Sequence, residues 1–459
     1  MRSTSVEPAA APLPGARLAL VALLVINLFN YIDRYILAAV IPQVEPVLFP
    51  HGHPQAKFLL GLLSSAFLVT YMVTSPLFGW LGDRMARWKL IGFGVLFWSL
   101  ASGASGLAGW WHPPGFAGDW RLDVGMLGLW VLPGAYVLMF LTRCLVGVGE
   151  AAYGPVAPTM IADFYPVKVR GSKLAWFYLA FPVGSALGYA LGGMSVTWLS
   201  WRWAFFLVVP PGLALGIWCY LLREPPRGQV EAGPVAPQRT LRLADYTILL
   251  QTPSYVLNCL AMTAMSFSLG GMAAWMPAYV QQRPEHALGA TRLFGIEPVT
   301  AFGLVTVVAG FLATLAGGVA GDWLRPRVAG SYFLVSGTAM LAAFPFVLLT
   351  LATPFPLAWV WIFLAEFGLF FNTGPTNTAL ANVTHPAMRA TAFALNIFFI
   401  HALGDVISPP IIGHIADRTN LDDGFRLVSV AILLGGLLWL WGTRYLAYDT
   451  ERAPSRLGP

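Results

Sequence analysis

Long apolar stretches with very few charges are the feature that most constrains how this sequence can fold. Charged residues make up 10% of the 459 residues, whereas a soluble domain carries about 25%. A stretch of about 18 or more apolar residues is typical of a transmembrane helix, because a bilayer offers backbone groups no water to bond. The short alternating segments of a membrane β-barrel are absent from the sequence. The sequence therefore predicts an all-α membrane protein.

Twelve such stretches divide the chain into two sets of six. We predict the first six helices near residues 17–44, 58–82, 90–109, 134–164, 171–197 and 203–222. The second six are predicted near 254–281, 299–323, 329–351, 357–383, 388–416 and 424–447. The predicted organisation is a disordered cytoplasmic tail (1–15), an N-terminal bundle (16–222), a cytoplasmic linker (223–245), a C-terminal bundle (246–449) and a cytoplasmic tail (450–459).

The segment 110–133 is the part of the chain for which this division leaves alternatives open. Its Trp110, Trp111, Pro113 and Asp119 suit a loop at the membrane interface. Residues 124–132 are apolar, so that they could form a short surface helix. A thirteenth transmembrane helix is the remaining alternative for this segment.

The basic residues predict the orientation of the helices. With both termini on the inner side, the outer segments hold only seven of the 27 basic residues, namely Lys57, Arg121, Arg202, Arg283, Arg292, Arg418 and Arg426. Arg34 and Arg143 lie within predicted helices, and the other 18 fall in inner segments. This bias indicates cytoplasmic termini, because basic loops are retained on the cytoplasmic side. It also explains the net charge of +6 without a nucleic-acid partner.

The two halves carry traces of an internal repeat. Gly79-Trp-Leu-Gly-Asp83 follows the second helix, and Gly318-Val-Ala-Gly-Asp322 follows the eighth, 239 residues later. Arg170 follows the fourth helix and Arg389 follows the tenth, 219 residues later. The extra loop at 110–133 accounts for the difference between the two offsets. A parallel repeat of this kind is a known plan of membrane transporters.

These residues resemble the major facilitator superfamily of transporters. The segment from Gly79 to Lys89 is similar to the superfamily's loop between helices two and three, and the segment from Gly318 to Arg327 is a degenerate second copy. Arg143 to Gly149 and the glycine-rich 184–193 resemble its fourth and fifth helices. The resemblance implies a fold of two pseudo-twofold-related six-helix bundles. It also implies gating or capping roles at the cytoplasmic ends for Asp83, Arg84, Arg87, Asp163, Arg170 and Asp322.

Three segments further resemble the spinster family within that superfamily. They are residues 30–34 (Asn-Tyr-Ile-Asp-Arg), 146–151 with 161–163, and 401–409 (His-Ala-Leu-Gly-Asp-Val-Ile-Ser-Pro). The first segment also resembles organic anion:cation symporters. The resemblance implies a secondary transporter of a lysolipid or another amphipathic anion, with a bacterial inner membrane as its location. A small organic anion is the alternative substrate.

Ionisable residues inside a membrane are costly and indicate function. We predict that Asp33 and Glu150 exchange protons, while Arg34 or Arg143 binds an anionic head group or pairs with a carboxylate. Asp33 and Arg34 are neighbours on one helix, so their side chains point about 100° apart and face different partners. The alternative is that these charges form structural ion pairs. Glu366 lies one turn before the position equivalent to Glu150 and could also face the cavity.

Other polar residues in the predicted helices are candidates for substrate contact. They are Tyr31, Tyr153, Asn258, Asn372 and Asn377. His401 and Asp405 form a possible proton relay in helix eleven, or else a structural pair beside the kink that Pro409 and Pro410 introduce. The repeat aligns Asp33 and Arg34 with apolar residues, so the cavity is predicted to be polar on its first-half side and largely apolar on the other.

Other classes of function are less compatible with the sequence. An enzyme would need a catalytic constellation, and the chain has no Gly-x-Ser-x-Gly, His-Glu-x-x-His or phosphate-binding loop motif. A channel would not need the repeated loops, which suit alternating access better. Cys144, Cys219 and Cys259 have neither metal-ligand nor disulfide spacing, and no cofactor is predicted. We expect a monomer with protons, a small-molecule or lysolipid substrate and the bilayer as its partners.

Overall fold

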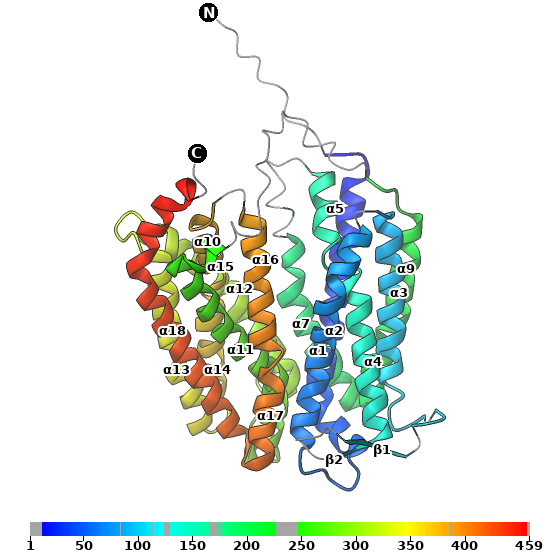
Figure 1. Cartoon of the computed structure of the whole chain (residues 1–459). Helices are drawn as coiled ribbons and strands as arrows, with labels where there is room; N and C mark the ends of the chain where they lie inside the picture. Colours follow the sequence, from blue (N-terminus) through cyan, green and yellow to red (C-terminus); the bar gives the residue numbers. More distant parts are fainter. Residues whose placement is uncertain are drawn as a thin grey trace, which may run out of the picture.

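The computed structural model describes residues 12–82, 84–111, 113–116, 118–123, 129–165, 173, 176–225, 247–385 and 388–456. Asp83, Arg170 and most of the predicted linker lie outside these residues. Figure 1 shows two bundles of roughly parallel helices side by side, with the first half in blue to green and the second half in green to red.

The first half contains helices of very different lengths. They are α1 (Ala16–Leu48), α2 (Ala56–Gly82), α3 (Arg87–Ser105), α4 (Gly134–Ala151), α5 (Ala157–Phe164), α7 (Ala180–Trp198), α8 (Trp201–Leu207) and α9 (Val209–Leu221). Between α8 and α9, the sixth predicted helix bends at Val208, because Pro210 and Pro211 follow at the start of α9 and cannot donate backbone hydrogen bonds.

The second half begins with the short α10 (Thr247–Leu250). It continues with α11 (Pro253–Gln282), η4 (Pro284–His286), α12 (Pro298–Leu324), α13 (Ser331–Ala352), α14 (Ala358–Phe370), α15 (Thr373–Asn382), α16 (Arg389–Ile400), the π-helical η6 (His401–Asp405), α17 (Ser408–Arg418), α18 (Leu421–Arg452) and η7 (Ala453–Ser455). Among the described residues, ten helical stretches are long and apolar enough to span a membrane. The helix α3 and the α14–α15 pair occupy the remaining two predicted positions, so the predicted twelve-helix fold is confirmed.

Helices four and ten are each broken at the same point of the repeat. The sequence predicted single helices at 134–164 and 357–383, whereas α4 ends at Ala151 and α14 ends at Phe370. These ends are 219 residues apart, which is the offset between Arg170 and Arg389. Pro155 and Pro375 lie just beyond the two breaks, and proline removes the donor that a continuous helix needs.

The segment 110–133 forms a β-hairpin in the part that the structure describes. Strand β1 (Asp119–Asp123) pairs antiparallel with β2 (Leu129–Pro133), and Arg121 lies opposite Val131. The expected surface helix at 124–132 is therefore wrong for residues 129–132, and residues 124–128 lie outside the description. Residues 129–133 are a short continuous apolar run, which periodicity alone cannot assign to a strand or to a helix.

The predicted tail at 450–459 is helical as far as Ser455, because α18 continues to Arg452 and η7 follows it. Asp449 explains the extension. It is buried, and its Oδ2 accepts hydrogen bonds from the backbone N–H and the hydroxyl of Ser254 at the start of α11, at 2.9 and 2.6 Å. Its Oδ1 pairs with Arg456 at 2.5 Å. The last turns of α18 therefore cap α11.

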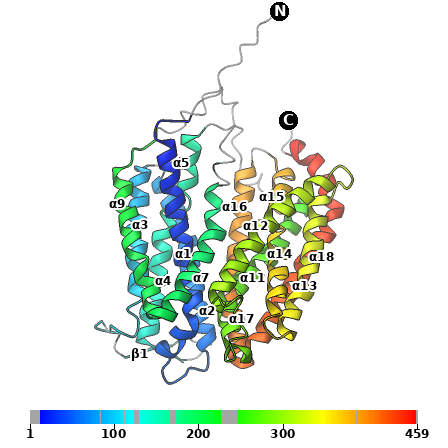
Figure 2. The ribbon, with the colours of Figure 1, turned by 180° about the vertical axis from the view of Figure 1, so that it is seen from behind.

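Among the described residues, the main contact between the two halves lies at one end of the helices. We call the end that carries Leu48, Ala56, Gln282 and Arg418 the hairpin end, and the end that carries Ala16 and Arg452 the terminus end. In Figures 1 and 2 the ribbons of the two halves lie close at the hairpin end and apart at the terminus end. Among the described residues, extensive packing between halves joins α2 to α17, α7 to α12 and α1 to α11, with a smaller contact of α2 with η6.

We call this contact the seam, and close backbone approach is its main feature. A Cβ atom added to Gly413 of α17 would lie 2.2 Å from the Lys57 carbonyl oxygen, and one added to Gly61 of α2 would lie 2.5 Å from that of Pro409. Asp417 adds a cap across the seam, since its carboxylate accepts the backbone N–H groups of Lys57 and Phe58, both at 2.8 Å. Helix α2 of one half is thus capped by the other half.

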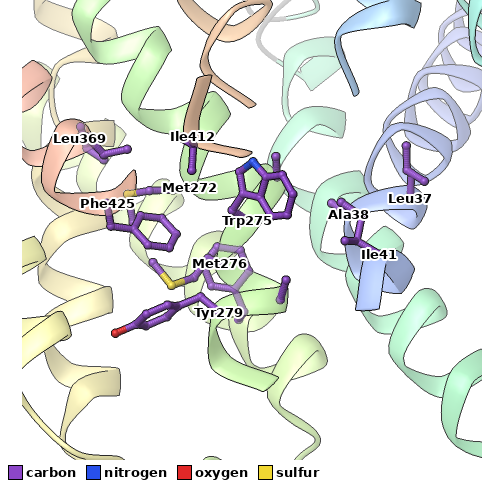
Figure 3. Packing of buried hydrophobic residues seen from close by; sticks show 14 of the residues in the cluster. Leu37, Ala38, Ile41, Met272, Trp275, Met276, Tyr279, Leu369, Ile412 and Phe425 are labelled. Carbon is purple, nitrogen blue, oxygen red and sulfur yellow. The ribbon is translucent and has the colours of Figure 1, made fainter. Parts of the chain in front are cut away.

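Large apolar side chains fill the seam between α1 and α11. Figure 3 shows Leu37, Ala38 and Ile41 of α1 on one side and Trp275 and Met276 of α11 on the other, all of them buried. The Trp275 indole N–H donates to the Pro409 carbonyl oxygen at 2.8 Å, so its polar atom is satisfied. This packing closes the hairpin end of the molecule.

Candidate functional site

A central cavity of about 350 Å³ lies between the two halves, on the terminus side of the seam. Its first-half wall includes Tyr31, Arg34, Tyr35, Phe67, Phe181 and Tyr189, and its second-half wall includes Ser266, Phe302, Thr306, Glu366, Phe370, His401 and Asp405. The spacing of Tyr31, Arg34, Tyr35 and Ala38 puts them on one face of α1, which explains why they line the same wall. Five residues predicted as site residues therefore line this cavity: Tyr31, Arg34, Glu366, His401 and Asp405.

Arg34 is the basic residue that this wall presents. Its Nε and Nη2 both lie 2.7 Å from Oε2 of Glu150 in α4. The Arg34 side chain is 18% exposed, whereas the Glu150 side chain is fully buried. Three aromatic rings surround the guanidinium, with centroids 5.1 Å (Tyr31), 5.2 Å (Phe67) and 5.4 Å (Tyr71) from its central carbon. Such contacts favour a cation at this position.

Asp33 and Arg143 form a second pair between the same two helices, behind the cavity wall. Arg143 Nη1 lies 4.0 Å from Asp33 Oδ2, and both side chains are almost completely buried. The Ser102 hydroxyl of α3 donates to Asp33 Oδ1. Within the described part of the chain, Asp33 Oδ2, Arg143 Nε and Nη1, and Glu150 Oε1 lack hydrogen-bond partners. These buried charges are thus incompletely satisfied, which is costly unless the arrangement serves a purpose.

The two pairs cross each other between α1 and α4. Arg34 of α1 pairs with Glu150 of α4, and Asp33 of α1 faces Arg143 of α4. The different partners of Asp33 and Arg34 follow from the angle of about 100° between consecutive side chains on a helix. The structure brings all four predicted charges together, but only Arg34 reaches the central cavity. Asp33 instead borders a separate space of about 10 Å³ beside Ser102.

The second-half wall is not the largely apolar surface that the repeat predicted. Glu366 lines the cavity and accepts a hydrogen bond from the Thr306 hydroxyl at 2.9 Å on Oε1. His401 Nδ1 lies 2.9 Å from Asp405 Oδ2, and both of these residues line the cavity as well. The prediction failed because it compared only the positions that align with the first-half charges. Glu366 lies one turn away from such a position, and η6 has no counterpart in that comparison.

The π-helical turn of η6 explains how His401 and Asp405 come to face the cavity. The Val406 N–H donates to the His401 carbonyl oxygen at 3.1 Å, five residues back along the chain. Pro409 and Pro410 follow and lack N–H groups, so that the carbonyls of Asp405 and Val406 lose their usual helical partners. The Ser65 hydroxyl of α2 donates to the Val406 carbonyl oxygen across the seam. A π-turn of this kind is frequent at functional sites.

Like Arg143, four uncharged residues predicted to contact substrate lie outside the cavity lining. The Tyr153 hydroxyl donates to the Leu23 carbonyl oxygen at 2.6 Å, in the core of the first half. Asn258 joins α11 to Thr376 of α15 at 3.2 Å and to Trp439 of α18 at 2.9 Å. Asn372 and Asn377 donate to carbonyl oxygens one turn before them, at 3.0 and 2.7 Å. The amide N–H groups of both residues are thus satisfied within their own helices, whereas Asn372 Oδ1 is buried without a partner among the described residues.

The predicted gating residues lie at the terminus end of each half. Arg87 is buried and pairs with Asp163 at 2.5 Å and with Glu224 at 2.9 Å. The Tyr332 hydroxyl donates to Asp322 at 2.8 Å. Arg84 stacks on Trp80, with its central carbon 4.1 Å from the centroid of the ring. These contacts each lie within one half, while Asp83 and Arg170 lie outside the described residues.

Several cavity residues had no place in the sequence prediction. Tyr35 lies four residues after Tyr31, and this spacing could have identified it. Tyr189 belongs to the glycine-rich helix α7, where Gly188 allows α1 to approach so closely that a Cβ atom would lie 2.6 Å from the Ile32 carbonyl oxygen. Phe67 and Thr306 gave no signal, because aromatic and hydroxyl side chains are common throughout apolar helices.

Comparison with known proteins identifies the class. The sequence pattern of the Major Facilitator Superfamily matches residues 23–409. A bacterial homologue of the human lysosomal transporter spinster, in an inward-facing and unoccupied conformation, has the same fold, with a TM-score of 0.75 and 19% identity over 96% of this chain and 99% of the other. A D-xylose–proton symporter gives a TM-score of 0.65 at 17% identity, over 94% and 96% of the two chains. The chain is a multi-pass membrane transporter, not an enzyme, and belongs to the major facilitator superfamily.

Curated relatives then specify the family. Protein spinster homolog 1 of Homo sapiens is 35% identical over 96% of this chain and 83% of its own length. A sphingosine-1-phosphate transporter of Danio rerio is 31% identical over 94% of this chain and 84% of its own. Within the superfamily, this chain is therefore a member of the spinster family.

Proposed function

We propose that this transporter is a proton-coupled carrier of a lysolipid or another amphipathic anion, and that it works by alternating access. The observation that carries the proposal is the Arg34–Glu150 pair at the cavity wall. Arg34 is the only basic side chain that lines the cavity within the described residues, except for His401, and a buried carboxylate holds it at 2.7 Å. A guanidinium held in this way is available to an anion once the carboxylate is neutral.

Proton transfer provides the switch in this proposal. A proton on Glu150 Oε1, which has no partner among the described residues, neutralises the carboxylate and leaves the Arg34 guanidinium free. Arg34 then binds the phosphate or carboxylate of the substrate through two parallel N–H donors. The Asp33–Arg143 pair supports a second protonation step, because its 4.0 Å contact is weak and Asp33 Oδ2 is unpaired among the described residues. Loss of the protons restores the ion pairs and releases the anion.

The shape and chemistry of the cavity suit an amphipathic molecule. Aromatic and aliphatic side chains form most of its walls, including Phe67, Leu68, Phe181, Phe302 and Phe370. A hydrocarbon chain gains about 25 cal/mol for each Å² of apolar surface that such walls remove from water. The relative in Danio rerio is named a sphingosine-1-phosphate transporter, which supports a substrate of this class.

The orientation remains part of the proposal. The excess of basic residues in the inner segments supports cytoplasmic termini, a cytoplasmic linker at 223–245 and cytoplasmic tails. With that orientation the seam closes the outer face and the cavity opens toward the cytoplasm. We place Asp83, Arg84, Arg87, Asp163, Arg170 and Asp322 in the cytoplasmic gate. We further propose that the carrier acts as a monomer in a bacterial inner membrane.

Replacing Asp33 by Asn tests the coupling. In proteoliposomes with an imposed pH gradient, D33N is expected to lose most of the gradient-driven uptake of a labelled lysophospholipid. Exchange of labelled for unlabelled substrate without a gradient is expected to continue, since it needs no net proton movement. Asp423→Asn is the control, because Asp423 pairs with Arg426 at an exposed position of α18.

The outcome separates the alternatives. Gradient-driven uptake by D33N equal to that of the wild type would remove Asp33 from the coupling mechanism. Uptake of small organic anions in preference to single-chain lipids would support the symporter alternative for the substrate. Ohmic single-channel currents would contradict a carrier of either kind.

A further inference from the structure

Two arginines at the terminus end are held against tryptophan rings in the same way. Arg84 follows α2, and its central carbon lies 4.1 Å from the ring centroid of Trp80. Arg327 follows α12, and its central carbon lies 4.5 Å from the ring centroid of Trp323. In both pairs, Nη1 of the arginine donates to the carbonyl oxygen of the same tryptophan, at 3.2 and 3.5 Å. A guanidinium has five N–H donors, so most of them remain available to a partner.

Exposure distinguishes these two stacks from the arginine–aromatic contacts at the hairpin end. Trp80 is 51% exposed and Trp323 is 64% exposed. The rings on which Arg202 and Arg283 stack are only 5% and 3% exposed. An exposed tryptophan at the end of a membrane-spanning helix lies at the level of the lipid head groups. The two stacks therefore present a ring and a cation together at the membrane surface.

The internal repeat does not account for the two stacks. With the offset of 239 residues, Trp80 aligns with Val319, so Trp323 lies four residues further along the second half. Four residues are about one helical turn. Each half thus reaches the same arrangement at its own position, which favours a role for the stacks in the folded protein.

The local charge indicates the kind of partner that the stacks fit. The segment from Gly79 to Lys89 holds three basic residues and one acidic residue, and the segment 318–327 holds two and one. A third exposed stack, Arg452 on Tyr448, lies at the same end of the molecule with 4.5 Å between carbon and ring centroid. The segment 448–456 has two basic and two acidic residues, with Glu451 directly before Arg452. The stacks at α2 and α12 therefore attract an anion, whereas the stack on α18 is neutralised.

Helices α2 and α12 give their two stacks a common place in the fold. Phe67 of α2 and Phe302 of α12 line the central cavity. Across the seam, α2 packs on α17 and α12 packs on α7. At the terminus end the two halves lie apart (Figures 1 and 2). Each stack thus lies at the free end of a helix that borders the other half.

We infer that the Trp80–Arg84 and Trp323–Arg327 stacks bind the phosphate head groups of anionic lipids in the membrane leaflet at the terminus end. The ring lies in the head-group layer, and the guanidinium offers two parallel donors to a phosphate. An anionic leaflet attracts basic side chains at this level. The partner is a lipid of the surrounding bilayer, so that the inference goes beyond the proposed function and does not depend on which molecule is transported.

Two lipids with the same acyl chains test the arginines. The full-length protein in detergent is titrated with phosphatidylglycerol, which is anionic, and with phosphatidylcholine, which has no net charge, and native mass spectrometry counts the bound lipids. Arg84→Gln combined with Arg327→Gln is expected to weaken binding of the first two phosphatidylglycerol molecules about fivefold each, with phosphatidylcholine binding within about twofold. Arg452→Gln is the matched control, because it removes a stacked arginine from the neutralised segment, and its binding is expected to stay within about twofold.

A second pair of substitutions tests the rings while the arginines remain. Trp80→Leu combined with Trp323→Leu is expected to weaken phosphatidylglycerol binding about threefold, because the guanidinium loses the face that holds it. Trp198→Leu is the control for loss of an exposed tryptophan, since Trp198 is 75% exposed and no described arginine stacks on it.

Each outcome decides for or against the inference. Unchanged phosphatidylglycerol affinity in R84Q/R327Q would overturn it, as would an equal loss in R452Q, which would show only a general effect of positive charge. Equal weakening of phosphatidylcholine binding would also overturn it, because the head group would then not be recognised. Unchanged binding in W80L/W323L would remove the rings from the site. Retained phosphatidylcholine binding shows that the variants are folded.

Discussion

Arg34 is the side chain that we propose binds the anionic group of the substrate. It reaches the cavity, it is paired with a buried carboxylate, and it lies among three aromatic rings. Arg143 carries the same charge but is completely buried and faces Asp33 instead. The two arginines of one charge cluster are therefore placed for different tasks, and on α1 the carboxylate Asp33 and the guanidinium of Arg34 are one position apart.

Replacing Arg34 by Lys tests whether the shape of the guanidinium matters as well as its charge. A lysine keeps the charge but cannot offer two parallel donors to a phosphate. We expect R34K to bind decyl phosphate about tenfold more weakly, which corresponds to about 1.4 kcal/mol, as measured by calorimetry. Arg426→Lys, at the exposed pair with Asp423, is the matched control. Unchanged affinity in R34K would mean that the anion is not bound bidentately.

The sequence could predict the charged residues of the site but, apart from Tyr31, not its uncharged ones. Asp33, Arg34, Arg143 and Glu150 are conspicuous because charges inside a membrane are costly. Thr306 is not conspicuous, because a threonine hydroxyl in any apolar helix can donate to a backbone carbonyl oxygen of the preceding turn. The asparagines predicted to contact substrate lie outside the cavity lining and bond to backbone carbonyl oxygens instead. Asn258 holds three helices together, and nothing in its neighbours distinguishes this role from substrate contact.

At the scale of the helices, breaks and caps explain most of what the sequence left open. Length and hydropathy predicted twelve spans, because the bilayer imposes both. The breaks in the helices after Ala151 and Phe370 were not predicted, because the apolar pattern of the sequence continues across them. The cap that Asp417 provides for α2 was not predicted either, because it joins residues that are 360 positions apart in the chain. Such contacts depend on the tertiary arrangement rather than on local pattern.

Replacing Gly413 by Ala should open the seam. The added methyl carbon would lie 2.2 Å from the Lys57 carbonyl oxygen, and backbone atoms must move to accommodate it. We expect faster labelling of Ile41→Cys, which lies buried in the seam, by a membrane-impermeant maleimide in a background without the native cysteines. Each 1.4 kcal/mol of clash would raise the open population about tenfold.

Gly318→Ala is the matched control for this substitution. Gly318 lies in α12, and no atom outside its chain neighbours and the nearby helix backbone lies within 4 Å of the added methyl carbon. Labelling of Ile41→Cys in G318A is expected to match that in the unsubstituted background. Equal labelling rates in G413A and G318A would show that the seam does not depend on the close approach of α17 to α2.

At the scale of the whole molecule, the two bundles are joined at the hairpin end and separate toward the terminus end (Figure 2). Alternating access requires the seam to part when the other end closes. Gln43 of α1 and Gln281 of α11 contact each other across it, with 3.3 Å between Nε2 and Oε1. This pair offers a direct test of the motion.

Linking the two positions should stop transport without stopping binding. Cysteines at Gln43 and Gln281, joined by a short bifunctional thiol reagent, hold the seam closed while the cavity stays accessible. We expect uptake into proteoliposomes to fall to the level of empty vesicles, and decyl phosphate binding to stay within about twofold. Reagent applied to either single cysteine variant is the control. Full transport by the cross-linked protein would contradict opening at this seam.

The composition of the seam has a consequence for experiments in solution. The ion pairs that join two described residues all lie within one half, whereas backbone contact, apolar packing and hydrogen bonds hold the halves together. Dissolved salt screens exposed charges over about 8–10 Å but leaves buried packing nearly unaffected. A change in ionic strength should therefore leave the equilibrium between the closed and the open seam unchanged. An effect of salt on the transport rate would report the capture of a charged substrate.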